Sequence, residues 1–524
     1  MNDSVFVVLL LIGSALFAYK RFLKYLRFLQ QENYLPSRFL KWVWNQRAFD
    51  RRATLLLIST ALFRIDILGA IGLSILSFFE KDPRKSGKLT LKMTKRAKRI
   101  FGVGISLYLG CAFLWIVFYK GDFVFWLGQI LLIQAIPLFL SLACYMLSWE
   151  EHGRQKQFLL EAKQILKKSN PLIIGITGSY GKTSTKEALG QILQVTLGPT
   201  FWPPMGVNTH MGIAKEVREN FKKGTKFAVM EIGAYWQGTI QRVCEFIPPS
   251  AAVITGVGSA HLERFGSLEN IYLAKSELAA AVPQEGILIC NGDNPGARRM
   301  AKEYPKKTTL LYGLEKNQEL DCLISPLDTR IDGTRFTLEW QGKEYRGFTP
   351  QLGKPALSNL AAVFTMACTL GSNPEYVLAA MHHVEPIENR LQARKQGKVV
   401  FLRDAYNSNP IGFASALEVM LSLPGKRRIL MTPGMIELGH LQAEQNKAMG
   451  KLAASVCDLV LIVNEENRKS LSEGLLQGGF SSQNVLFCNT RQNAFQQLEA
   501  LLREEDIVLI ENDLPDLYES YETF

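Results

Sequence analysis

The segment GITGSYGKTSTKEAL, residues 175–189, has the composition of a loop that binds phosphate groups. An apolar run enters it and a helical pattern leaves it, so its backbone amides would surround an anion at a helix N-terminus. The ammonium group of Lys182 would reach the terminal phosphates, and the hydroxyl of Thr183 would ligate magnesium. The predicted nucleotide-binding residues of this loop are Gly178, Ser179, Gly181, Lys182, Thr183 and Ser184. Ile176 replaces the first glycine of the common Walker form, so the loop predicts nucleotide binding without giving the reaction.

Further polar motifs follow the loop in order along the chain. They are GVNTHMG with Asn208 and Thr209, MEIGA with Glu231, AHLE with His261, AKSE with Lys275, NGDNPGA with Asn294, ENRLQAR with Arg390, and DAYNSNP with Asp404, Tyr406, Asn407 and Asn409. This ordered series resembles the Mur ligase family, the ATP-dependent amide ligases of peptidoglycan precursor synthesis. Within the family it is most similar to the member that adds D-alanyl-D-alanine, and the resemblance covers residues 171 to about 510.

The resemblance implies a role for each motif. Thr183 would hold one magnesium ion and Glu231 and His261 a second, while Lys275 would carry a carbamate that supplies oxygen ligands. These four residues are the predicted metal ligands, and Lys182, Lys275, His261 and Glu231 are the predicted catalytic set. The remaining predicted nucleotide contacts are Asn208 near the γ-phosphate, Asn294 at the adenine, Arg390 at the phosphates, Asp404 at the ribose and Tyr406 beside the nucleotide, with Asn407 completing the last motif.

The implied chemistry has two steps. A substrate carboxylate attacks the γ-phosphoryl group of ATP, which gives an acyl phosphate and ADP, and an amine then attacks the acyl carbon. Because the first step brings two anions together, two Mg²⁺ ions and Lys182 are expected to stabilise it. The acyl phosphate must be kept from water, so closure of the domains is expected.

The sequence also departs from the family pattern at several positions. The histidine–asparagine pair usual in the central domain is replaced by Pro355 and Ala356, leaving Asn359. The glycine of the Gly-Arg linker is Asn389, and Gly434 stands where the family has an aspartate. These changes affect the adenine contacts and the incoming amine, while the metal and phosphate residues are retained.

The elements that must position these motifs are predicted from hydrophobic patterning. From residue 171 onward, buried apolar runs such as LIIGIT, FAVMEI, AAVITG and RILMTP alternate with helical segments. This alternation predicts parallel sheets with helical crossovers. Residues 319–347 alternate in polarity and predict a small antiparallel addition. The expected organisation is a central nucleotide-binding α/β domain at 171–387 and a C-terminal Rossmann-like α/β domain at 388–524, preceded by a helical linker at 151–170.

The first 150 residues have a different composition. Residues 4–19, 100–119 and 123–149 contain no charged side chain, and the last two are long enough for transmembrane helices. The first run lacks a basic start and a cleavage site, so a retained anchor is expected rather than a signal peptide. Residues 53–79 are apolar but contain Arg64 and Asp66, which are costly in lipid. A re-entrant hairpin or an interfacial pair of helices is therefore expected there.

The charge distribution supports a membrane domain and argues against nucleic acid. The net charge is +12, yet residues 20–52 and residues 80–99 each carry nine lysines and arginines against two acids, so the rest of the chain is slightly acidic. Basic loops beside apolar helices are typical of the cytoplasmic side of a membrane. The eight cysteines form no CxxC pair, as expected in a reducing compartment. We therefore expect a multi-pass protein of the bacterial inner membrane with its catalytic domains in the cytoplasm.

The sequence predicts a membrane-anchored ATP-dependent amide ligase that acts in peptidoglycan or other envelope synthesis. Its carboxylate substrate would be lipid-linked or close to the membrane, and the amine would come from an amino acid or peptide. One alternative is a poly-amino-acid ligase similar to poly-γ-glutamate synthetases. Another is an inactive membrane scaffold, although a scaffold would not need the retained metal and phosphate residues. The sequence does not identify either substrate. It also leaves open whether the protein is a monomer or a homo-oligomer.

Overall fold

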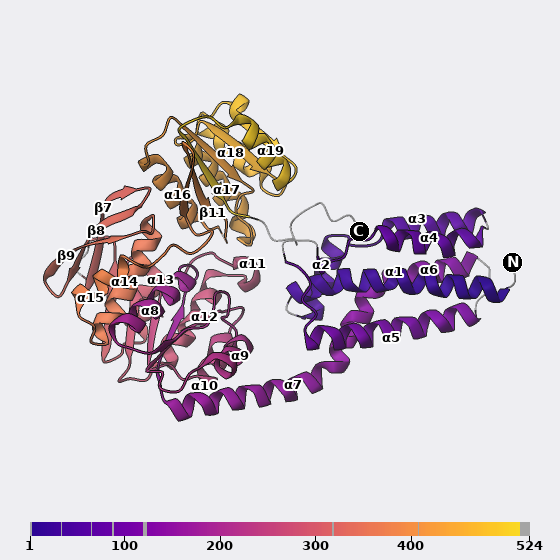
Figure 1. Cartoon of the computed structure of the whole chain (residues 1–524), viewed down its shortest axis with the longest axis horizontal. Coiled ribbons are helices and arrows are strands. Elements are labelled where there is room, and N and C mark those ends of the chain that lie inside the picture. Colours follow the sequence, from indigo (N-terminus) through magenta and orange to yellow (C-terminus); the bar gives the residue numbers. More distant parts are fainter. Residues whose placement is uncertain are drawn as a thin grey trace. The chain divides into compact units, whose positions relative to one another are not determined.

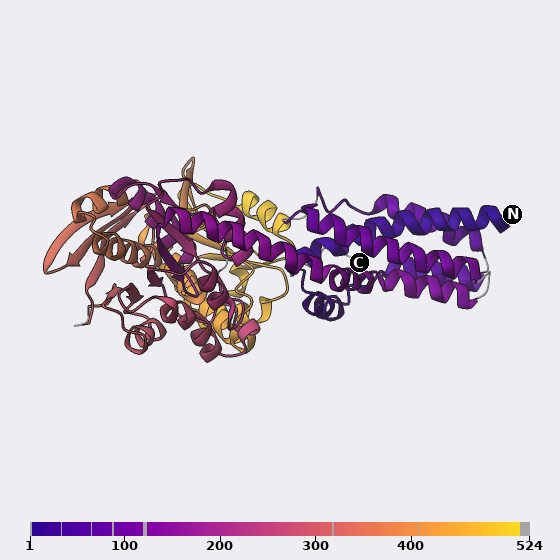
Figure 2. The same ribbon diagram turned by 90° about the horizontal axis from the view of Figure 1, so that it is seen from below.

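The protein is described by a computed structural model that covers residues 3–32, 34–63, 65–85, 89–118, 123–316, 319–406 and 408–513. The chain forms two compact units, one ending at Arg154 and the other beginning at Gln155. Figures 1 and 2 show a helical N-terminal unit and a mixed α/β unit. The change of composition near residue 150 therefore coincides with the boundary between the two units.

The N-terminal unit is a bundle of helices. They are α1 (Asp3–Gln31), α2 (Pro36–Asn45), α3 (Arg51–Phe63), α4 (Asp66–Phe79), α5 (Lys95–Phe118), α6 (Phe123–Gln134) and the first part of α7 (Ile136–Ser169). Five of them, α1, α3, α4, α5 and α6, run alongside one another (Figures 1 and 2). By length and composition, α5 is long and apolar enough to cross a membrane, and α6 with the start of α7 would be a second such segment if the bent pair is counted as one.

Helix α7 bears on two expectations, of which it corrects the first. Residues 123–149 were expected as one straight span, but the helix breaks between Gln134 and Ile136 with a bend of 52°. Pro137, the second residue of α7, explains the break, because proline has no amide hydrogen and its ring collides with the preceding turn. The expected helical linker at 151–170 lies within α7, which runs unbroken to Ser169. Its last turns pack Ala162 and Leu166 into the core of the α/β unit.

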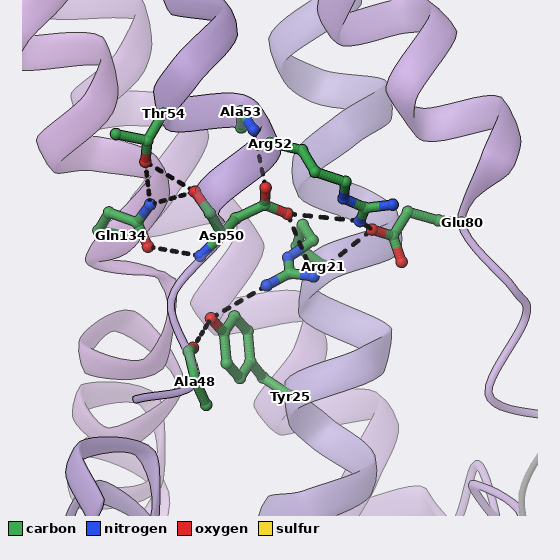
Figure 3. A network of polar contacts seen from close by, with 9 residues as sticks. All are labelled: Arg21, Tyr25, Ala48, Asp50, Arg52, Ala53, Thr54, Glu80 and Gln134. Carbon is green, nitrogen blue, oxygen red and sulfur yellow. Dashed lines mark hydrogen bonds and ion pairs between the residues drawn. The ribbon is translucent and has the colours of Figure 1, made fainter. Parts of the chain in front are cut away.

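A network of polar contacts lies inside the helical bundle (Figure 3). At its centre the buried guanidinium group of Arg21 on α1 lies 3.3 Å from Asp50 Oδ2 and 3.4 Å from Glu80 Oε1. It also donates to the hydroxyl of Tyr25 at 3.2 Å, and Arg52 pairs with the carboxylate of Glu80. Two acids and two arginines are thus gathered together, which offsets the cost of removing each charge from water.

The same network joins the ends of several helices. Asp50 caps α3 by accepting from the amide of Ala53 at 2.8 Å, and Gln134 at the end of α6 exchanges two hydrogen bonds with the backbone of Asp50. Asp50 precedes α3 and Glu80 follows α4, yet both contact Arg21. Residues 53–79 therefore begin and end at the same level of the bundle, as a helical hairpin of α3 and α4. Its relation to a membrane stays a prediction, and Arg64 lies outside the described residues.

The central domain of the α/β unit contains a nine-stranded sheet. The strands lie in the order β2-β3-β1-β4-β5-β6-β7-β8-β9, parallel through β7 and antiparallel from β7 to β9. They are β1 (Leu172–Thr177), β2 (Thr200–Phe201), β3 (Phe227–Glu231), β4 (Ala251–Ile254), β5 (Ile287–Asn291), β6 (Thr308–Gly313), β7 (Cys322–Arg330), β8 (Gly333–Trp340) and β9 (Lys343–Thr349). The parallel sheet and the antiparallel addition near 319–347 are both confirmed.

Helices cover both faces of this sheet, as expected for buried parallel strands. One face is packed by α9 (His210–Asn220), α10 (Thr239–Phe246), α12 (Leu268–Ala281), α13 (Pro295–Glu303) and the end of α7, and the other by α8 (Lys182–Thr196), α14 (Lys354–Thr369) and α15 (Pro374–Met381). The short helix α11 (Leu262–Phe265) follows β4. The carboxyl ends of β1, β3 and β4 consequently meet at one edge, where a ligand of such a sheet is expected.

The C-terminal domain has a six-stranded sheet in the order β10-β11-β15-β12-β13-β14, parallel except for β10. Its strands are β10 (Gln392–Gln396), β11 (Val399–Asp404), β12 (Arg427–Thr432), β13 (Leu459–Val463), β14 (Val485–Cys488) and β15 (Asp506–Glu511). Helices α16 (Pro410–Ser422), α17 (Gln442–Ala454), α18 (Arg468–Gln477) and α19 (Arg491–Leu501) cover it, with a 3₁₀ turn, η1 (Gly439–Leu441), before α17. The predicted Rossmann-like α/β domain is present.

Candidate nucleotide and metal site

The loop between β1 and α8 has the geometry expected for binding phosphate. Gly181 caps α8 with φ of +77°, a conformation that favours glycine, and a side chain on Gly178 would collide with the hydroxyl of Thr255. Ser179 is tied to the loop after β4, because its Oγ donates to the Gly258 carbonyl at 3.0 Å and accepts from the Gly258 amide at 2.8 Å. The backbone is therefore held open at the N-terminus of α8. Ser184 lies in the first turn of that helix.

Lys182 folds back over this loop. Its Nζ donates to the Gly178 carbonyl at 2.8 Å and approaches the Ser179 carbonyl at 3.5 Å. Burial lowers the pKa of Lys182, the carboxylate of Glu231 opposes that shift, and the charge of Arg390 adds to it. The ammonium group has only carbonyl hydrogen-bond partners among the described residues, so a phosphate group would supply the counter-charge that it lacks.

Thr183 and Glu231 are brought into direct contact. Thr183 Oγ1 donates to Glu231 Oε2 at 2.8 Å, and the other carboxylate oxygen accepts from Asn208 Nδ2 at 2.9 Å. Tyr235 donates to Asn208 Oδ1 at 3.2 Å and fixes the orientation of that amide. Glu231 is 2% exposed, so this hydroxyl–carboxylate pair is a buried oxygen-donor site. The neighbouring Thr209 has a different role, because it caps α9.

Lys275 on α12 is buried and makes no hydrogen bond or ion pair with the residues that the structure describes. Burial, and then the charge of Lys182, lowers the pKa of Lys275 well below its usual value. This shift favours the neutral amine, which is the form that can react with carbon dioxide. Lys182 and Lys275 thus lie close enough to influence each other.

His261 is engaged by a residue that sequence reasoning missed. Its Nδ1 lies 2.5 Å from Oε2 of Glu437, and Arg264 donates to Glu437 Oε1 at 2.9 Å. Burial alone would raise the pKa of Glu437, but its contacts with His261 and Arg264 hold that pKa at about 2. Glu437 lies in the motif GMIELG, whose first glycine, Gly434, is one of the departures from the family pattern. That neighbouring departure was the only sequence signal for Glu437.

The residue predicted at the adenine has structural partners. Asn294 caps α13, and its side chain both accepts from the Val257 amide at 2.9 Å and donates to the Val257 carbonyl at 3.0 Å. It therefore shapes the loop after β4. Asn359, retained from the altered histidine–asparagine motif, accepts from the hydroxyl of Thr185 at 3.3 Å and lies against Gly181. Both asparagines thus support the loop region.

In the C-terminal domain, Arg390 stacks on Tyr406 with 4.8 Å between the guanidinium carbon and the ring centroid. Asp404 accepts from the Leu391 amide at 3.2 Å, which ties the end of β11 to the chain that enters this domain. Asn409 caps α16, whereas Asn407 lies outside the described residues. Arg390, Asp404 and Tyr406 are thus grouped, and the influence of Arg390 on the pKa of Lys182 places this group toward the phosphate loop.

Asp404 has an acidic neighbour on the adjacent strand. Asp404 and Glu511 are partners in the parallel pairing of β11 with β15, and the hydroxyl of Ser408 donates to Glu511. Burial raises the pKa of Asp404 to about 6, while the Leu391 amide and Arg390 limit the rise. Burial and the charge of Asp404 raise the pKa of Glu511 well above its ordinary value. Both shifts thus favour the protonated form of these two acids.

Two departures from the family pattern have a visible physical basis. Asn389 stands where a glycine is usual, and its φ of +61° is a conformation that asparagine tolerates better than most residues. Gly434, with φ of +77°, replaces an aspartate, and a Cβ there would lie 2.5 Å from Asn446 Oδ1 and 2.9 Å from Asn467 Cβ. The two asparagines fill the space that the missing side chain would need.

The described residues contain no group of three or more His, Cys, Asp and Glu side chains arranged around a common point. Magnesium does not require such a cage, because it keeps several waters and is usually bound by one or two carboxylates together with phosphate oxygens. The Thr183 hydroxyl and the buried Glu231 carboxylate, beside a loop with open backbone amides, fit that donor set. The residues present therefore fit ATP with magnesium.

Comparison with known proteins agrees with this geometry. The family model described as Mur ligase middle domain matches residues 176–367, and the one described as Mur ligase, glutamate ligase domain, matches residues 389–511. The UDP-N-acetylmuramoyl-tripeptide–D-alanyl-D-alanine ligase of Mycobacterium bovis is 29% identical over 359 residues, which cover 64% of this chain and 69% of that protein. The ligase of the same name from Bacillus subtilis is 30% identical over 296 residues, 55% of this chain and 62% of that protein.

Solved structures give the same result for the fold. The MurF ligase of Thermotoga maritima in complex with ADP is 25% identical, with a TM-score of 0.61 over 68% of this chain and 80% of that one. MurF from Acinetobacter baumannii, 22% identical, has a TM-score of 0.62 over 70% of this chain and 78% of that one. The predicted resemblance, including the similarity to the D-alanyl-D-alanine-adding member, is confirmed for the core between residues 176 and 511.

Proposed function

We propose, from the premise that this chain belongs to the Mur ligase family of ATP-dependent amide ligases with a core similar to MurF, that it forms an amide bond during synthesis of peptidoglycan or a related envelope polymer. The observation that carries the proposal is the 2.8 Å hydrogen bond between the Thr183 hydroxyl and Glu231 beside the phosphate loop. It joins a loop suited to a triphosphate with a buried carboxylate suited to its magnesium ion. A glycine turn with only a structural role would need neither partner.

The residues act on the reaction as follows. A carboxylate oxygen of the substrate attacks the γ-phosphorus of ATP, the bond to the β-phosphate oxygen breaks, and ADP leaves. Lys182 and the amides of the loop stabilise the charge that spreads over the transferred group. The nitrogen of the incoming amine then attacks the acyl carbon, phosphate leaves and the nitrogen loses a proton. Arg390, stacked on Tyr406, brings a further positive charge toward the phosphates from the C-terminal domain.

Magnesium, when bound, neutralises phosphate charge and aligns the triphosphate. Thr183 would hold the first ion, and Glu231 with His261 would hold the second, with Lys275 supplying further oxygen ligands. Lys275 suits this role only after it has become a carbamate, since an amine near Lys182 is a poor magnesium ligand. Its burial and lowered pKa support that modification.

We further propose that the N-terminal unit attaches the enzyme to the cytoplasmic face of the membrane, so that the carboxylate substrate is lipid-linked or close to the membrane. Large apolar side chains of its helices are exposed, including Leu62, Phe63, Phe78, Phe79, Phe113 and Phe118. A surface of this kind on several neighbouring helices fits the hydrocarbon of a bilayer. The basic segments 20–52 and 80–99 suit anionic lipid headgroups beside it.

The test is ADP release by the full chain purified in detergent. Wild type and Lys182→Ala are compared with amino acid and dipeptide amines and with two acceptors, a nucleotide-linked and a lipid-linked precursor that carry the same free carboxylate. We expect ADP formation with the lipid-linked acceptor and none with Lys182→Ala. Equal rates with both acceptors would remove the lipid-linked part of the proposal, and ADP release with glutamate alone would favour a poly-amino-acid ligase. A folded wild type that is inactive with every pair would favour the scaffold.

A further inference from the structure

The contact between His261 and Glu437 joins two domains of the α/β unit. His261 follows β4 in the central domain, whereas Glu437 follows β12 in the C-terminal domain, 176 residues later in the chain. The junction has further contacts, because the amide of Glu263 donates to the Glu437 carbonyl at 3.4 Å and Leu441 packs against the central core. Glu437 therefore belongs to a docked interface.

Both residues of the pair have an unusual backbone. His261 and Glu437 each have a φ of +62°, a left-handed backbone conformation that residues other than glycine and asparagine rarely adopt. Such strain persists only where the surroundings determine the conformation, and it is frequent at functional sites. The two strained residues are the ones whose side chains meet at 2.5 Å.

The geometry at the imidazole is that of a metal-binding histidine. Ligating histidines commonly give one ring nitrogen to the metal and the other to a carboxylate, which fixes the orientation and tautomer of the ring. Here Nδ1 is taken by Glu437, and Nε2 has no hydrogen bond to the residues that the structure describes. Arg264 holds the second oxygen of Glu437 at 2.9 Å, so the carboxylate itself is fixed.

We propose that Glu437 is a positioning residue that orients His261 with Nε2 toward the metal, so that the C-terminal domain completes the magnesium site of the central domain. The inference rests on the proposed role of His261 as a magnesium ligand. If it is right, the affinity for the second magnesium ion depends on contact between the two domains, because Glu437 comes from the C-terminal domain.

The experiment measures metal affinity in addition to turnover. Mn²⁺ binding to the full chain in the presence of ADP is followed by the electron paramagnetic resonance signal of free Mn²⁺, and ADP binding in EDTA is measured separately. Glu437→Gln removes the charge and leaves a weaker acceptor for Nδ1. We expect its Mn²⁺ affinity to fall about 10-fold to 100-fold, as is typical when the partner of a metal-binding histidine is lost. ADP affinity in EDTA should stay within about twofold, because the phosphate loop is untouched.

Two controls separate the explanations. Glu263→Gln changes a neighbouring acid whose side chain is exposed, and it should bind Mn²⁺ as wild type does. Arg264→Gln frees one oxygen of Glu437 but leaves the other on Nδ1 of His261, so we expect a smaller loss of Mn²⁺ affinity than in Glu437→Gln, whereas an equal loss in both variants would show that the glutamate only joins the domains. Wild-type Mn²⁺ affinity in Glu437→Gln, or an equal loss of ADP affinity in EDTA, would overturn the inference. His261→Ala tests the premise separately: if it also binds Mn²⁺ as wild type does, the metal role of His261 fails, whereas a loss in His261→Ala alone removes only the role of Glu437.

Discussion

The hydroxyl of Thr183 donates a 2.8 Å hydrogen bond to Oε2 of Glu231, and so connects the first turn of α8 to the end of β3. Because β1 lies between β3 and β4 in the sheet, the phosphate loop and both flanking strand ends share one edge. The contact places a hydroxyl and a carboxylate where a magnesium ion bound to ATP would lie.

Removal of that hydroxyl should impair magnesium-dependent turnover while leaving the fold intact. Thr183→Val keeps the shape of the side chain but has no oxygen, so we expect kcat/KM for ATP to fall about 100-fold, the scale of losing one charge-stabilising contact. Thr183→Ser retains the oxygen and should stay within about fivefold of wild type. Steady-state ADP release at several Mg²⁺ concentrations measures both, and similar activity of the valine and serine variants would contradict the assignment.

Lys275→Ala should be inactive and should recover part of its activity with a short carboxylate such as acetate or formate. The reason is that the proposed carbamate would act through its oxygens, and a small carboxylate can occupy the space left by the side chain. Lys275→Arg keeps a positive charge, fills the space and should not respond. ADP release with and without added carboxylate is the measurement, and an unmodified role for Lys275 would be indicated by activity in the arginine variant.

The acidic pair on β11 and β15 should make stability depend on pH. The pKa of Asp404 is about 6 in the folded protein and near 3.8 when unperturbed, so ionising it costs folding free energy. Its favourable contribution is complete below pH 3.8 and is lost as the pH rises through 6. Asp404→Asn keeps the acceptor for the Leu391 amide and removes the charge, so it should gain stability over wild type as pH rises from 4 to 6, by at most about 3 kcal/mol.

Thermal unfolding of wild type and Asp404→Asn across pH 4–8 checks this prediction. A constant difference over that range would show that Asp404 does not titrate with a raised pKa. Asp458→Asn is a suitable control, since this acid lies in the same domain and its Oδ2 accepts from the Arg428 amide at 2.7 Å at an exposed position. Asp458→Asn should not gain stability over wild type as the pH rises from 4 to 6.

The buried network of the N-terminal unit should matter more to stability than an ion pair at its surface. Arg21→Met leaves the buried Asp50 with only the partly exposed Arg52, 3.6 Å away, and breaking a buried pair costs about 3–5 kcal/mol. Arg84→Met removes an exposed pair with Asp82 and should cost less than about 1 kcal/mol. Thermal unfolding of the two variants in the same detergent compares them, and equal effects would contradict a structural role for the network.

The hairpin of α3 and α4 predicts that both of its ends face the cytoplasm. Arg51→Cys and Lys81→Cys, made in a Cys111→Ser background because Cys111 is the exposed native cysteine, place one thiol at each end. Both should react with a membrane-impermeant maleimide in inside-out vesicles, and neither should react in intact cells. Labelling of one position from outside would mean that the segment crosses the membrane.

The sequence predicted the elements that are buried on both faces. Four continuous apolar runs each form a strand: LIIGIT, FAVME, RILMT and LVLIV. Runs of this kind are typical of parallel strands, whose side chains are covered by helices on both faces of the sheet. β2 has two residues and β14 alternates only weakly, so neither has a periodic signal of its own. The break at Pro137 could have been expected from its missing amide hydrogen, but the apolar composition on both sides concealed it.

The site was predictable where its chemistry is local. The spacing of Gly181, Lys182 and Thr183 already implies a phosphate loop, whereas Glu437 is recognised only by its contact with His261 from a distant part of the chain. The same holds for Arg21, which the sequence presents as one charge in a basic loop. Its pairing with Glu80 depends on how the helices pack, and composition does not determine that.

Gly434 has a practical consequence for selective inhibition. The space beside it is occupied by the buried side chains of Asn446 and Asn467, which are hydrogen-bonded within the domain, so position 434 contributes no carboxylate to this loop. A compound whose affinity for other members of the family depended on a cationic group placed against an aspartate there would lose that attraction here.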